Sequence, residues 1–162
     1  MLKAGKVRPP TRNEPLVIRW GDKWIQTSDA WQVPKSGVVR GEILSVRGDP
    51  DQGFDIKVDG WLKLSGGERV GTLRTWNDDR YEPSVEYRFH SDDGILRVWN
   101  VYKMRYPGGQ VVQERWTENA GMWVERISED QRVYHCSPGM ASPPDFESLV
   151  FRVSVRALSL VQ

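Results

Sequence analysis

Cysteine and histidine are scarce in this sequence, which has one cysteine and two histidines among 162 residues. A single cysteine excludes a disulfide within the chain and fits a reducing compartment, so we expect a cytoplasmic protein. His90 lies far along the sequence from the adjacent pair His135 and Cys136. Neighbouring residues of a strand point to opposite faces, so His135 and Cys136 would not bind the same ion. We therefore expect no metal and no cofactor.

Long apolar runs and a strong net charge are also lacking. The first ten residues contain no apolar run, so we expect no signal peptide and no membrane anchor. The 23 Lys and Arg residues nearly balance the 22 Asp and Glu residues, for a formal net charge of +1. This balance does not favour nucleic acid or an acidic membrane surface as a partner. No glycine-containing loop is followed by the helix that a phosphate-binding loop requires.

Alternation of apolar and polar residues is the main positive feature from residue 38 onward. Short alternating runs are separated by turn residues, which is typical of antiparallel β-structure. The predicted strands are 38–47, 54–64, 69–76, 84–90, 95–106, 110–117, 122–128, 131–136 and 149–160. The pattern predicts an all-β fold in which consecutive hairpins form an antiparallel up-and-down meander that closes into a barrel. A two-sheet β-sandwich is the alternative.

The start of the chain differs from the rest in composition. Residues 1–15 are basic and contain prolines, so we expect an N-terminal tail or arm. The remaining residues, 16–162, have a length that fits a single β-barrel domain. The segment 16–31 contains three tryptophans without a clear periodicity, and we expect it to cap one end of the barrel.

Several of the eight tryptophans share a strand face with charged residues rather than with aliphatic ones. Trp61 is in phase with Asp55, Lys57, Asp59 and Lys63, whereas the positions between them are mainly apolar. An indole that fills the core is expected in phase with the aliphatic residues. The pattern therefore predicts a second surface, aromatic and polar, that contacts something other than the main core.

The lengths of the turns predict which side chains face one another. A four-residue turn at 91–94 would place Arg88 opposite Arg97 and Glu86 opposite Trp99. Three-residue turns at 107–109 and 119–121 would pair Met104 with Val112, Arg115 with Glu125, and Glu114 with Arg126. The resulting polar face contains Glu86, Arg88, His90, Arg97, Trp99, Gln113, Arg115, Trp123 and Glu125.

Two arginines directly opposite each other on a sheet destabilise it unless a carboxylate or a bound anion lies between them. We therefore expect a pocket for a small anionic or aromatic molecule on this face. Arg88 and Arg97 would bind a carboxylate, and Trp99 and Trp123 would form the walls. The other ligand-binding candidates are Glu86 and Arg115.

Three other interpretations of the same face stay open. It could be a solvated surface on which carboxylates neutralise the arginines and arginine stems cover the indoles. It could be an exposed strip of Trp61, Trp76 and Trp99 on a non-enzymatic module that recognises a glycan or a protein. It could also be the subunit interface of a homodimer, because Trp and Arg are enriched in interfaces.

One part of the chain resembles the phenolic acid decarboxylases, a family with lipocalin-like barrels of the calycin type. The matching residues are Tyr87-Arg88-Phe89-His90-Ser91, then Arg97, and then Trp116-Thr117-Glu118. The resemblance implies a cofactor-free site that removes the carboxylate of a phenylpropenoic acid, with Arg97 and Glu118 as functional residues. Tyr102, Glu118 or His90 would supply proton transfer in a reaction of the decarboxylase, lyase or isomerase type. The residues leave open whether any reaction is catalysed.

Overall fold

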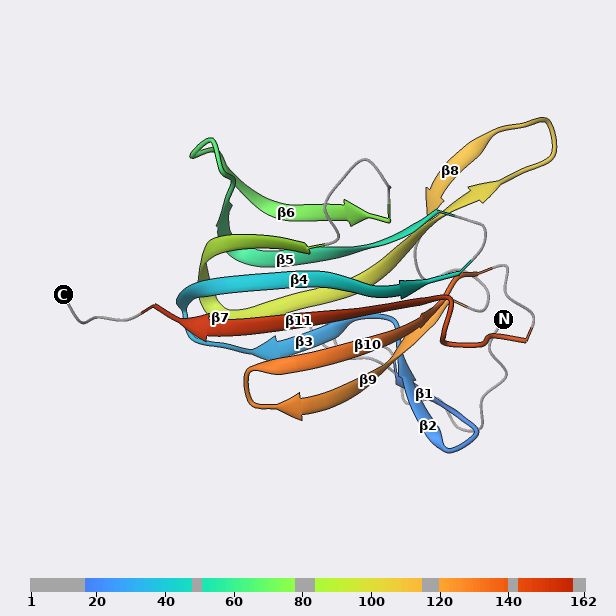
Figure 1. The fold of residues 1–162 in the computed structure, drawn as a ribbon, viewed down its shortest axis with the longest axis horizontal. Helices are drawn as coiled ribbons and strands as arrows, with labels where there is room; N and C mark the ends of the chain where they lie inside the picture. Colours follow the sequence, from blue (N-terminus) through green and yellow to red (C-terminus); the bar gives the residue numbers. More distant parts are fainter. Residues whose placement is uncertain (1–16, 48–50, 78–83, 115–119, 140–142, 159–162) are drawn as a thin grey trace.

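A computed structural model describes residues 17–47, 51–77, 84–114, 120–139 and 143–158. These residues form strands and their connections, with no helix that is long and apolar enough to cross a membrane. The strands are β1 (Val17–Trp20), β2 (Lys23–Gln26), β3 (Asp29–Gln32), β4 (Ser36–Val46), β5 (Gln52–Lys63), β6 (Arg69–Trp76), β7 (Ser84–Arg105), β8 (Val111–Glu114), β9 (Gly121–Ser128), β10 (Gln131–Ser137) and β11 (Leu149–Ala157) (Figure 1). The prediction of an all-β fold is confirmed, and residues 17–32, which had no clear periodicity, contribute three short strands to it.

All strand pairs are antiparallel, but their order is not that of an up-and-down meander. The sheet runs β1-β2-β9-β10-β11-β4-β7-β5-β6, with β3 and β8 each paired to β7. Strands distant in sequence therefore lie side by side: β2 next to β9, and β11 next to β4. Among the described strands no pairing joins β1 to β6, so the sheet curves without closing into a barrel (Figure 1).

The predicted hairpin turn at 91–94 is wrong, because these residues lie inside the single long strand β7. β5 pairs with β7 on both sides of them, with Gly60 opposite Ser91 and Val58 opposite Leu96, so the extra residues of β7 form a bulge. Ser91 Oγ accepts a hydrogen bond from the Ile95 N–H at 3.0 Å and lies 2.8 Å from the Ile95 carbonyl oxygen. These local bonds replace ladder bonds and let the strand change direction.

The bulge separates the two arginines that the predicted hairpin had opposed. Arg88 lies opposite Val38 and Lys63. Arg97 lies opposite Ala30 and Lys57. Glu86 likewise lies opposite Arg40 and not opposite Trp99.

The next predicted hairpin is confirmed, since Met104 lies opposite Val112 across the β7–β8 turn. The third is not seen, because β9 pairs with β10 and β2. Glu114 consequently lies opposite Tyr102, and Arg126 lies opposite Arg132. Arg115, the predicted partner of Glu125, is outside the described residues.

The concave side of the sheet is filled with large side chains rather than hollow. Phe54 of β5 stacks on Phe151 of β11 with ring centroids 4.4 Å apart, and Tyr134 of β10 stacks on the same ring at 4.8 Å. The apolar residues predicted on β7, such as Phe89, Leu96 and Val98, are fully buried beside them. Because this packing occupies the middle of the fold, any binding site must lie at its margins.

Candidate functional site

The structure does not bring the sequence-predicted site residues together. On β7, Tyr102 is fully buried, and Trp99, three residues away on the opposite face, is 6% exposed. Arg88 is exposed, and Arg97 Nη2 lies 3.5 Å from Asp93 Oδ2. Glu86 Oε1 lies 3.6 Å from Arg156 Nη2 at the surface. Arg115 and Glu118 lie outside the described residues.

The remaining two candidates make separate local contacts. His90 Nδ1 lies 3.0 Å from Ser36 Oγ, and His90 Nε2 lies 3.1 Å from Asp92 Oδ1. The Trp123 ring stacks on the His135 ring at 4.0 Å and 4°, and Lys23 Nζ lies 4.2 Å from the Trp123 ring centroid. His90 and Trp123 therefore do not share a site.

Lys or Arg side chains lie over most of the described indole rings. These contacts explain why tryptophans share strand faces with charged residues. Arg69 lies 4.2 Å from the Trp61 ring, and Lys103 lies 4.7 Å from the Trp76 ring. Trp99, the third member of the strip proposed for glycan recognition, is buried. A sugar needs a free ring face for stacking, so these contacts favour the interpretation that cationic side chains shield the indoles.

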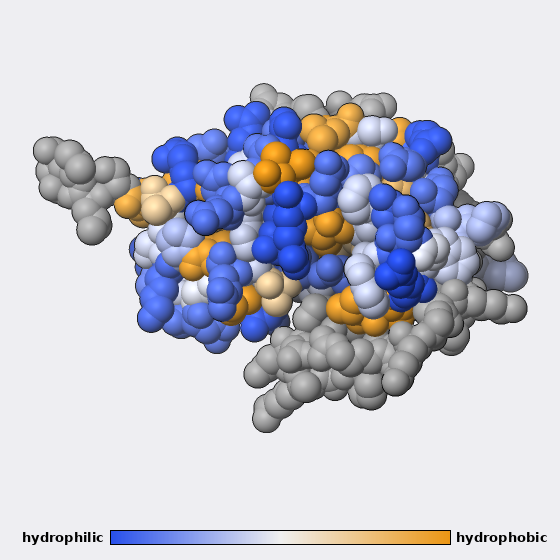
Figure 2. All heavy atoms as spheres, turned by 90° about the horizontal axis from the view of Figure 1, so that it is seen from below, coloured by the Kyte–Doolittle hydropathy of each residue, from blue (hydrophilic) through white to orange (hydrophobic). Residues whose placement is uncertain are grey.

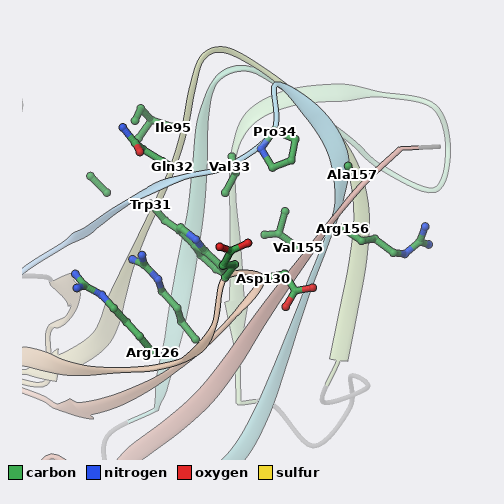
Figure 3. A pocket seen from close by; sticks show the side chains of 13 residues that line it. Trp31, Gln32, Val33, Pro34, Ile95, Arg126, Asp130, Val155, Arg156 and Ala157 are labelled. Atoms are coloured by element: carbon green, nitrogen blue, oxygen red, sulfur yellow. The ribbon is translucent and has the colours of Figure 1, made fainter. Parts of the chain in front are cut away.

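A groove of about 930 Å³ lies where β3 diverges from the β9–β10 hairpin and from the end of β11 (Figure 3). It is lined by Ala30, Trp31, Gln32, Val33, Pro34, Ile95, Arg126, Glu129, Asp130, Arg132, Val155, Arg156 and Ala157. A second hollow of about 560 Å³ lies between β2, β3 and β9 and shares Ala30 and Arg126 with it. The two together border the whole of β3 on the side away from β7.

Arg126 lies directly opposite Arg132 at the floor of this groove. Register places both on the face that carries Met122, Tyr134 and the buried core. Like charges in direct opposition destabilise a sheet unless a counter-charge lies nearby. The pair of opposed arginines that was expected on β7 is thus found on the β9–β10 hairpin instead.

A buried carboxylate, Asp29 of β3, holds one of the two arginines in place. Arg132 Nη1 donates to both Asp29 oxygens, at 2.9 and 2.7 Å, and its guanidinium lies 4.7 Å from the Trp31 ring centroid. The Tyr134 hydroxyl donates to Asp29 Oδ2 at 2.7 Å. Burial, followed by the nearby Asp29 carboxylate, raises the pKa of Tyr134 well above its ordinary value. Tyr134 therefore stays a neutral donor at physiological pH.

Some hydrogen-bond donors of Arg126 and Arg132 have no acceptor among the described residues. Arg132 Nε is buried and has no hydrogen-bond acceptor. Arg126 is exposed, and no carboxylate of the described residues pairs with it. Farther along the groove lie the exposed carboxylates of the 129–130 turn, of which Asp130 accepts a hydrogen bond from Ser128 Oγ at 2.7 Å. The groove thus offers unpaired cationic donors at one end and carboxylates near the turn.

Apolar side chains form the rest of the wall, from Val33, Pro34 and Ile95 on one side and Val155 on the other (Figure 3). On the face of the molecule seen in Figure 2, apolar residues form several separate patches among hydrophilic ones. Among the residues that the structure describes, no group of His, Cys, Asp and Glu is arranged to hold a metal ion. The groove combines apolar walls with the guanidinium of Arg126, unpaired among the described residues, and these are the elements of a site for a small molecule.

Sequence reasoning missed this site because Asp29 and Trp31 lie on β3, whereas Arg126 and Arg132 lie on the β9–β10 hairpin, which is distant along the chain. The sequence feature that could have indicated the arginine pair is the tight turn at 129–130, which brings the ends of β9 and β10 together. Comparison of the chain with protein-family models, with curated proteins and with solved structures finds no match.

Proposed function

We propose that this protein binds a small anionic molecule with an apolar body in the groove beside β3. The opposition of Arg126 and Arg132 carries this proposal, because both line the groove and only Arg132 has a carboxylate partner. An anion between the two guanidinium groups would relieve their repulsion and supply an acceptor for Arg126. In this proposal the curved sheet acts as an incomplete barrel of the calycin type, with the groove at its open side.

The two arginines would have different roles. Asp29 and Trp31 immobilise Arg132, so little side-chain freedom is lost when a ligand binds. Asp29 binds Nη1 and Nε is buried, so Nη2 is the donor that Arg132 would offer to a carboxylate. Arg126 would close over the anion from the opposite strand. The apolar part of the ligand would lie against Val33 and Val155.

The proposal is for binding and not for a reaction. The removal of a carboxylate that the family resemblance implies would require Arg97 and Glu118. Arg97 is not among the groove residues, and Glu118 is outside the described part of the chain. That reaction stays a prediction from the resemblance alone.

Titration calorimetry with benzoate and hexanoate, and with the neutral benzamide and hexanamide, tests the proposal. We expect the carboxylates to bind, the amides to bind at least about tenfold more weakly, and added salt to weaken carboxylate binding. Arg126→Gln should reduce carboxylate affinity by about tenfold or more. Arg88→Gln, which removes an exposed arginine outside the groove, is the matched control and should leave the affinity unchanged. Equal effects of the two substitutions, or equal binding of acids and amides, would contradict the proposal.

A further inference from the structure

One edge of β3 is unpaired among the described strands, and its polar backbone groups face the groove. β3 pairs with β7 alone, with Asp29 opposite Val98 and Trp31 opposite Leu96. The Val33 N–H donates to the Gly94 carbonyl at 2.9 Å, so residue 33 directs its backbone groups toward β7. Alternate residues of a strand direct their N–H and C=O groups to the same edge. Ala30 and Gln32 therefore direct theirs away from β7 and into the groove.

The lining of the groove agrees with this geometry. Five consecutive residues, 30–34, line it, which places the groove along the strand edge and not over one face. On the far side lies β9, whose residues beyond Trp123 pair only with β10 among the described strands, since β2 meets β9 only at Met122 and Trp123. In Figure 1 β3 and β9 run in the same direction, so a chain running the other way would be antiparallel to both.

We propose, on the basis of the proposed function, that the anion is the C-terminal carboxylate of an extended peptide that adds a strand to β3. The peptide backbone would exchange hydrogen bonds with Ala30 and Gln32, and its carboxylate would bind Arg126 and Arg132. The carboxylates of Glu129 and Asp130, also in the groove, suit a peptide that carries a basic side chain better than they suit a simple anion.

Gln32→Pro tests the backbone contact directly. Proline lacks the N–H, and at an edge position whose N–H points away from the neighbouring strand it leaves the ladder to β7 intact. Gln32→Ala removes the same exposed side chain but keeps the N–H, so the difference between the two variants measures the backbone donor. Ala30→Pro is the second variant, because the backbone of Ala30 has the same orientation. Urea unfolding of each variant shows which of them is folded.

The probe is a random-peptide library displayed with free C-termini, followed by synthesis of an enriched peptide as acid and as amide. We expect the native protein to bind the acid, and Gln32→Ala to bind it at least about tenfold more tightly than Gln32→Pro does. Gln32→Pro, the amide and Arg126→Gln should each reduce affinity by about tenfold or more. Benzoate and hexanoate should bind Gln32→Pro as they bind the native protein, because they make no backbone contact with β3.

Four results would overturn the proposal. If hexanoate binds but no peptide is enriched, or if the folded proline variants bind the peptide unchanged, strand addition is wrong while the small-anion site survives. If neither hexanoate nor any peptide binds, both proposals fail. If sedimentation shows a native dimer that Gln32→Pro dissociates, the occupant of the edge is a second copy of the chain.

Discussion

Arg126 lies directly opposite Arg132 because Ile127 is skipped in the β9–β10 ladder. The turn sets Ser128 opposite Gln131, and a regular hairpin would continue with Arg126 opposite Val133. The register instead shifts between Gln131 and Arg132. This irregularity brings two guanidinium groups to the same face of the sheet, where Asp29 binds one of them. The candidate anion site depends on a one-residue feature of a single hairpin.

Loss of the Asp29 charge should destabilise the protein strongly. Asp29 is 2% exposed and accepts hydrogen bonds from Arg132 and Tyr134. We expect Asp29→Asn to lower the free energy of unfolding by about 3 kcal/mol, because the substitution leaves a largely buried guanidinium without its counter-charge. Asp93→Asn, which removes the partner of Arg97 in a more exposed pair, should cost less than about 1 kcal/mol. Urea unfolding measures both, and similar losses would contradict the role given to Asp29.

Substitution of Ser91 should destabilise the bend of β7. Its side chain is fully buried, and its Oγ accepts from the Ile95 N–H and lies within hydrogen-bond distance of the Ile95 carbonyl. Ser91→Ala should cost about 1 kcal/mol, since it removes the hydrogen bonds of a buried hydroxyl while the Ile95 N–H keeps Asp93 Oδ1 as an acceptor at 3.0 Å. Ser36→Ala removes an exposed hydroxyl beside His90 and should cost less than about 0.5 kcal/mol. Equal midpoints in urea for the two variants would show that the bulge does not need this hydroxyl.

Two glycines of the sheet should respond differently to a methyl group. A Cβ at Gly41 would lie 2.7 Å from the Phe54 ring, in the middle of the aromatic core. Gly41→Ala should therefore lower the free energy of unfolding by about 2 kcal/mol through overpacking. At Gly71 the nearest atom to a new Cβ is the Val58 carbonyl oxygen at 3.8 Å. Gly71→Ala should be neutral or stabilising by up to about 1 kcal/mol, because it restricts the unfolded chain.

Alkaline pH should destabilise the fold through Cys136 and Tyr134. Burial raises the pKa of Cys136 well above its ordinary value of 9.0, and burial followed by Asp29 raises the pKa of Tyr134 well above 10.0. The folded state thus favours both neutral forms. Their contribution is fully present below these ordinary values and is lost as the pH rises above them.

The free energy of unfolding should fall by up to about 1.4 kcal/mol per pH unit for each group above its ordinary pKa. Urea unfolding at a series of pH values measures this slope. Cys136→Ala should remove the part of the decline that begins near pH 9 and leave the part that begins near pH 10. The assignment of the first part to Cys136 would be wrong if the native protein and this variant had parallel profiles.

Local patterns were sufficient for much of the fold. Alternation identified the strands from residue 38 onward and placed Phe89, Leu96 and Val98 in the core. The turn at 107–109 was short enough that its length alone predicted Met104 opposite Val112. By contrast, the glycine and aspartates at 92–94 are typical of a turn, yet here they form a bulge, because β5 pairs with β7 on both sides of them.

The sequence by itself determined an all-β chain and the burial of apolar side chains such as Phe89, Leu96 and Val98, because these properties depend on neighbours a few residues away. Only the tertiary structure decided which charged groups meet. Asp29, Arg126 and Arg132 come together through the packing of β3 against the β9–β10 hairpin and through one skipped residue. A shift of one residue moves every later side chain to the opposite face, so the site depends on registers that local patterns do not contain.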